Sequence, residues 1–127
     1  MLLLFLTMGL ALELLHGLKT DWYLSVASST RRHMWILAHS HGALLGLINL
    51  AFASFLGWHS EQRGEISPWA SRLLIAATLL MPAGFFFGGV GAYSGDPGLA
   101  IALTPIGGLM LLVAVFLCSG FGPKRGP

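Results

Sequence analysis

The residues of this sequence best able to do chemistry are one glutamate and three histidines that lie within apolar segments. Glu13 and His16 are three positions apart in the first segment, and His39 and His41 are two positions apart in the second. Carboxylate oxygens and imidazole nitrogens are ligands that transition metals and haem iron accept in proteins. These four residues therefore predict a site for haem b or for a transition metal, with copper, iron and zinc as the candidates.

Four apolar segments must position these side chains. The sequence is 55% hydrophobic and 9% charged, whereas soluble domains are about 25% charged. A helix of about 20 apolar residues crosses the hydrocarbon core of a lipid bilayer. The sequence therefore predicts an all-α fold, an integral membrane four-helix bundle that residues 1–127 form as a single domain. The expected helices span about residues 2–18, 33–58, 68–92 and 99–121.

The residues at the ends of these segments support the expected boundaries. Trp35 and Trp58 lie near the two ends of the second segment, as aromatic residues do at membrane–water interfaces. Pro68 follows a serine, which is a common start for a helix, and residues 93–98 combine glycine and proline in a turn. The first segment is short for a span, and either an upstream start or a dipping helix would fit it.

Antiparallel packing of the first two segments would bring Glu13 and His16 to a similar depth in the membrane as His39 and His41. His33 is a further candidate ligand. His39 and His41 point about 200° apart around a helix, so one ion cannot take both without local distortion. We expect His39 to face inward, because it shares its side of the helix with Gly42 and Gly46. His41 would then face a second helix, a subunit or the lipid boundary.

A structural interpretation of the same residues stands beside the ligand hypothesis. An ionisable side chain inside a membrane costs about 2.5 kcal/mol or more unless it finds a partner. A histidine can find that partner in a carbonyl or serine of a neighbouring helix. Glu13 and His16 can also form a local neutral pair, or take part in a proton-coupled or quinone-handling function that changes between about pH 5 and 8.

Small residues form flat faces on the second and third segments. Such faces let helices approach closely in a membrane, and they exceed what one small bundle needs. They favour a homo-oligomer or a subunit of a larger membrane complex, so a non-catalytic structural or oligomerising role is the alternative function. The residues expected at these contacts are Ala38, Gly42, Gly46, Asn49, Gly84 and Gly88.

Charge and motifs exclude several other classes of protein. Seven Lys and Arg residues, five acidic residues and a net charge of +2 leave no basic run for nucleic acid. No phosphate loop, Gly-x-Ser-x-Gly, Cys-x-x-Cys or dinucleotide fingerprint is present. The expected location is a bacterial inner membrane, and the loop charges, four basic residues against three, favour both termini in the cytoplasm.

Residues 38–41, Ala-His-Ser-His, are followed by Gly46 and Asn49. This stretch resembles the Ala-His-x-His transmembrane motif of haem-copper oxidase-like proteins, which include the bacterial nitric-oxide-response membrane family. Histidines of such helices bind haem or copper in those proteins. The resemblance therefore implies that His39 or His41 is a ligand.

The third and fourth segments contain no histidine, whereas the resembling proteins have further spans with histidine. By this resemblance, a haem with two axial ligands would need His16 or a second copy of the chain. The whole chain also resembles small four-span bacterial membrane proteins of unknown function, through the Ala-His-x-His-Gly stretch and through residues 84–98 with their Gly-Asp-Pro-Gly turn. That second resemblance implies a fold and no activity.

Overall fold

The computed structural model describes residues 1–58 and 68–118, which fold into helices and turns without a strand. The expected all-α class is confirmed. The long helices are α1 (Leu2–Gly17), α3 (Ser29–Trp58), α4 (Pro68–Val90) and α5 (Leu103–Cys118). The short helical pieces are α2 (Asp21–Leu24), the 3-10 turn η1 (Val26–Ser28) and the 3-10 turn η3 (Leu99–Ala102).

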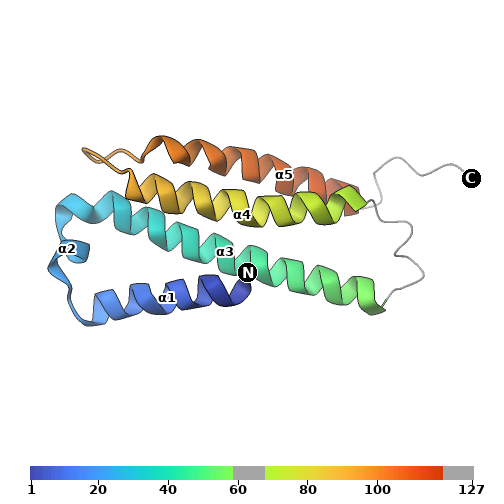
Figure 1. The fold of residues 1–127 in the computed structure, drawn as a ribbon, viewed down its shortest axis with the longest axis horizontal. Helices are drawn as coiled ribbons and strands as arrows, with labels where there is room; N and C mark the ends of the chain where they lie inside the picture. Colours follow the sequence, from blue (N-terminus) through green and yellow to red (C-terminus); the bar gives the residue numbers. More distant parts are fainter. Residues whose placement is uncertain (59–67, 119–127) are drawn as a thin grey trace, which may run out of the picture.

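Three helical stretches are long and apolar enough to cross a membrane. They are Val26–Trp58, Pro68–Val90 and Leu99–Cys118. The remaining long helix, α1, is apolar but has 16 residues, and at about 1.5 Å per residue it is shorter than the roughly 30 Å of a hydrocarbon core. Figure 1 shows that α1 runs beside only part of α3. The sequence predicts four spans, and the described residues contain three helical stretches long and apolar enough to cross a membrane.

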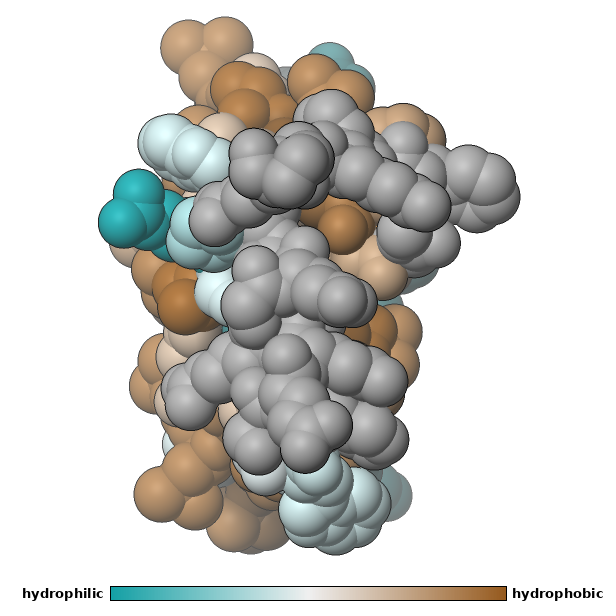
Figure 2. Space-filling model, turned by 90° about the vertical axis from the view of Figure 1, so that its right-hand side faces the viewer, coloured by the Kyte–Doolittle hydropathy of each residue, from teal (hydrophilic) through white to brown (hydrophobic). Residues whose placement is uncertain are grey.

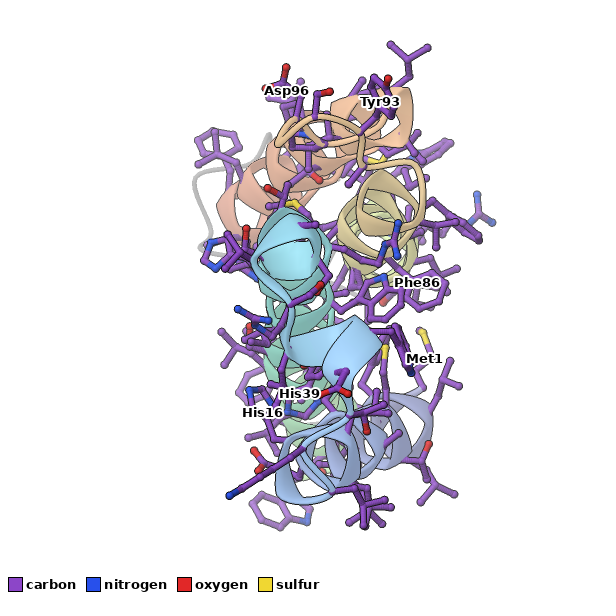
Figure 3. The ribbon with its side chains drawn as sticks, turned by 90° about the vertical axis from the view of Figure 1, so that its left-hand side faces the viewer. Met1, His16, His39, Phe86, Tyr93 and Asp96 are labelled. Carbon is purple, nitrogen blue, oxygen red and sulfur yellow. The ribbon has the colours of Figure 1, made fainter. Side chains whose placement is uncertain are left out.

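The long helices lie side by side in the order α1, α3, α4, α5 (Figure 1). The extensive contacts join neighbours in that order, with α3 and α4 in the middle and α1 and α5 at the edges. Seen along the helices, the row is bent, and its two edge helices lie far apart (Figure 3). The arrangement is therefore an open row. A membrane permits this, because apolar side chains gain little from facing each other instead of lipid.

Glycines set the distance between α4 and α5. A Cβ atom at Gly107 would lie 2.8 Å from the backbone nitrogen of Met81, and one at Gly84 would lie 2.8 Å from the backbone nitrogen of Thr104. Real Cβ atoms do not approach other atoms this closely, so the two backbones are in contact where a side chain would hold them apart. This is the packing that small residues permit between membrane helices.

The second long helix begins earlier than the sequence predicts, and the last begins at residue 99, as expected, but as a 3-10 turn. The second long helix begins at Ser29 rather than at residue 33, because α2 and η1 lead directly into it. The hydroxyl of Ser28, the last residue of η1, shares its hydrogen between the carbonyl oxygens of Tyr23 and Ser25, at 2.7 and 2.9 Å. The last long helix opens with the 3-10 turn η3 and becomes α-helical at Leu103. Pro105 thus falls in the first α-helical turn, where the missing N–H is not needed.

Alanine substitutions at two adjacent glycines test the contact between α4 and α5. Gly107→Ala should destabilise the protein by about 1–3 kcal/mol, because the new methyl group meets the backbone of α4. Gly108→Ala is the matched control, since its Cβ would meet only the end of the Met81 side chain, at 3.5 Å. Thermal unfolding in detergent, followed by circular dichroism, measures both. Equal melting temperatures for the two variants would contradict the close contact.

Candidate functional site

Polar side chains concentrate near the start of α3, where they connect this helix to α1, α2, α4 and the turn after α4. Five of them donate a hydrogen bond to a backbone carbonyl oxygen of another segment. The bonds join Thr30 to Gly95 (2.8 Å), Arg31 to Gly89 (3.3 Å), Arg32 to Tyr23 (2.7 Å), Trp35 to Phe86 (3.2 Å) and His39 to Phe5 (2.7 Å).

His39 lies against α1 and bonds to it. Its Nδ1 is 2.7 Å from the carbonyl oxygen of Phe5. In an α-helix that carbonyl points toward the residue four positions later, which here is Gly9. A Cβ atom at Gly9 would collide with the imidazole, 2.6 Å from Nδ1. The glycine therefore uncovers the carbonyl and makes room for the ring, which places His39 on the side of α3 that faces α1.

His41 lies on another side of the same helix. Its Nδ1 is 2.9 Å from the carbonyl oxygen of Leu37, one turn earlier in α3. Its ring is 4.9 Å from that of Phe85 in α4, measured between centroids. His41 is expected from the sequence to face a second helix, a subunit or the lipid boundary. In the structure it faces a second helix of the same chain, α4.

The structure does not bring His16 to the level of His39. Gly9 is level with His39, and His16, seven residues further along α1, is about 10 Å away along the helix axis. The two histidines project close together in the end-on view of Figure 3 because that view runs along the helices. Within residues 1–58 and 68–118, no group of three or more His, Cys, Asp or Glu side chains could hold a metal ion.

The expected packing residues lie at contacts within the chain. Ala38 is fully buried, and Asn49 donates to the hydroxyl of Thr78 in α4 at 2.7 Å. A Cβ atom at each of the four glycines would meet a neighbouring element: Phe5 at Gly42, Leu2 at Gly46, Thr104 at Gly84 and Ile101 at Gly88. The small-residue faces are thus occupied by the chain's own helices, so they no longer argue for an oligomer.

Tyr23 is the central residue of a cluster that the sequence does not reveal. Its side chain is 1% exposed and is surrounded by rings from three elements, which we call the Tyr23 cluster. The ring of His16 meets it edge-on at 5.0 Å, Trp22 lies edge-on at 6.0 Å, and Trp35 stacks on it at 6.5 Å, all between centroids. The guanidinium carbon of Arg32 is 5.9 Å from the ring centre.

The hydroxyl group of Tyr23 is buried and has no hydrogen-bond partner among the described residues. Burial raises the pKa of this phenol above its usual value near 10; the Arg32 guanidinium lowers it in part, and the Glu13 carboxylate raises it further. The hydroxyl therefore stays protonated at neutral pH, and it can donate or accept a hydrogen bond that the described residues do not supply.

Comparisons with protein-family models, with curated proteins and with solved structures give no match to this chain. The function must therefore be argued from the residues themselves.

Alanine at Gly9 tests whether His39 holds α1 to α3. Gly9→Ala should displace the imidazole, break its bond to Phe5 and destabilise the protein by about 1–3 kcal/mol. Gly17→Ala, in the same helix, is the control because a Cβ atom there meets nothing within 4 Å. Melting curves in detergent compare the variants. If Gly9→Ala melts at or above the temperature of Gly17→Ala, His39 does not hold the two helices together.

Proposed function

We propose that this chain is a non-catalytic structural subunit of a larger membrane complex, in which α1, α3, α4 and α5 all enter the bilayer. One observation carries the proposal: the polar side chains at the start of α3 bond to neighbouring segments of the chain, while the edges of the row are apolar. The membrane of this proposal is a bacterial inner membrane, and the charges of the loops favour both termini on the cytoplasmic side.

The bonds within the row support a structural role. His39 bonds α3 to α1, and Trp35 bonds α3 to α4. Asn49 bonds to the side chain of Thr78, which in turn donates to the carbonyl of Leu74. A catalytic site needs polar groups that converge on a substrate. Here they bond to neighbouring helices or, as His41 does, to a carbonyl of their own helix.

The edges of the row support a place beside other membrane components. Large apolar side chains are exposed along both edge helices, and apolar surface dominates the flanks visible in Figure 2. Continuous apolar surface of this extent suits lipid or the helices of a partner. The exposed residues include Leu3, Leu6 and Leu10 on α1 and Leu109, Leu112 and Val115 on α5.

Photo-crosslinking in native membranes tests this proposal. A photoreactive amino acid replaces Leu10 on α1 (63% exposed) or Leu112 on α5 (68% exposed). At least one edge should give a single discrete protein adduct, identified by mass spectrometry, and an adduct with a second copy would identify a homo-oligomer. The control position is Tyr93, 83% exposed in the turn before α5. Adducts with lipid alone at both edges would refute the subunit role.

Binding of haem b or a transition metal is a second candidate, favoured by one feature of the histidines. In His16, His39 and His41 the Nδ1 atom lies against a backbone carbonyl oxygen. A carbonyl only accepts, so Nδ1 carries the hydrogen and Nε2 keeps its lone pair. Histidines that ligate metals are commonly held in this way. Because the three rings do not converge, such a site would take ligands from two copies of the chain.

An absorption spectrum with elemental analysis of the purified, untagged protein tests this second candidate. A Soret band, or stoichiometric copper, iron or zinc, is expected if the site exists, and His39→Ala should remove most of it. His33→Ala is the control, because His33 is exposed at the start of α3. A colourless, metal-free protein from cells supplied with haem and metals would exclude the candidate.

A further inference from the structure

The last part of α3, about three turns long, has no helix beside it on the side that α1 covers nearer the start of α3. Leu2, the first residue of α1, lies against Gly46, and α3 continues from there to Trp58. Figure 1 shows α3 running past the N-terminal end of α1. Ala53 is exposed, and a Cβ atom at Gly57 would meet nothing within 4 Å. The surface on which α1 packs therefore continues along α3 without an occupant among the described residues.

Asn49 borders this open surface and has an unused hydrogen-bond acceptor. Its side-chain nitrogen donates to the carbonyl of Leu45 at 2.9 Å and to the hydroxyl of Thr78 at 2.7 Å. No described residue donates to its side-chain oxygen. Among the described residues, the side-chain atoms that are both enclosed and unpartnered are the hydroxyls of Tyr23 and Thr104. The oxygen of Asn49 is therefore accessible from outside the described chain.

The depth of Asn49 in a membrane makes this unused acceptor costly. Trp35 and Trp58 mark the two ends of the span, and Asn49 lies 14 positions after the first and nine before the second, about 21 and 14 Å along the helix axis. Lipid tails supply no hydrogen-bond donor at this depth. Asparagine side chains in membranes bond across to other helices, so the missing donor points to a further membrane helix.

A second copy of the chain does not supply this donor. Two copies inserted in the same direction would present Asn49 to each other at the same depth. Both hydrogens of that amide are already used within the chain. The nearby exposed hydroxyl of Ser54 donates to the carbonyl of Leu50, at 2.9 Å. The donor must therefore come from a different protein.

We propose that a transmembrane helix of a different protein docks on the surface formed by Asn49, Ala53 and Gly57, which we call the Asn49 face. A hydroxyl or amide group of that helix donates to the side-chain oxygen of Asn49. The small side chains of the other two residues let its backbone approach α3 closely, as Gly42 and Gly46 do for α1. This inference rests on the proposed function, because it names the surface through which the subunit meets its complex.

Photo-crosslinking from the border of the Asn49 face tests the inference. A photoreactive amino acid replaces Leu50, which is 56% exposed, and the control position is Leu44, which is 57% exposed and about 120° away around α3. In native membranes Leu50 should give one discrete adduct with a different protein, and Leu44 should give adducts with lipid alone. Mass spectrometry should locate the crosslink in a transmembrane segment of the partner, within one turn of a Ser, Thr, Asn or Gln.

Two alanines of α3 provide a matched pair of blocking variants. Ala53→Leu fills the Asn49 face and should lower the yield of the Leu50 adduct about fivefold or more, because the bulky side chain holds the partner helix away. Ala51→Leu, at an exposed position about 160° away around α3, should leave the yield unchanged. Both positions are exposed, so both variants should keep the melting temperature of the parent protein in detergent. A lower yield then cannot be attributed to unfolding.

Four results would overturn the inference: adducts of Leu50 with lipid alone, an adduct with a second copy, a crosslink within the chain itself, or equal yields for the two alanine variants. Crosslinks at Leu10 and Leu112 report the subunit role separately. A protein adduct at either of those positions, with lipid alone at Leu50, would remove this inference and leave the subunit role standing. Lipid alone at all three positions would remove both.

Discussion

The fold depends on one set of bonds, in which side chains near the start of α3 donate to backbone carbonyls of α1, α2, α4 and the turn after α4. Arg31 donates a hydrogen bond to the carbonyl of Gly89 in the last turn of α4. The final carbonyls of a helix have no partner within their own helix, and a positive charge is favourable there. His39 donates to a carbonyl of α1, and Arg32 donates to a carbonyl of α2. Because these donors point in different directions around one helix, they fix both the rotation of α3 and the height of its neighbours.

The helices could be predicted from the sequence, but the register between them could not. Apolar runs bounded by turns locate α4 and α5 within a few residues, since length and hydropathy alone decide a long apolar helix. The level of His39 relative to Glu13 depends on how α2 and η1 take up residues 21–28 between α1 and α3. That path is set by contacts of Tyr23 and Ser28. The spacing of apolar residues along the sequence does not predict these contacts.

The small residues show a second limit of prediction from the sequence. Gly42, Gly46 and Gly84 indicate close approach of another helix, and the structure shows such approach. The pattern cannot say whether that helix belongs to the same chain or to another copy, because a flat face suits either. Tyr23 is missed for a related reason: a tyrosine beside a tryptophan is typical of a membrane interface, and its burial depends on the docking of four residues of α2.

An open row distributes stability differently from a closed core. Each long helix depends chiefly on the helix beside it, so its energetics resemble those of a repeat protein, in which nearest-neighbour terms add along one dimension. The two edges then have no shared interface through which to cooperate. Detachment of α5 would leave the contact of His39 with Phe5 intact, and α1 could peel away without loosening α4 from α5. The molecule should therefore lose its structure from its margins inward, in separate steps.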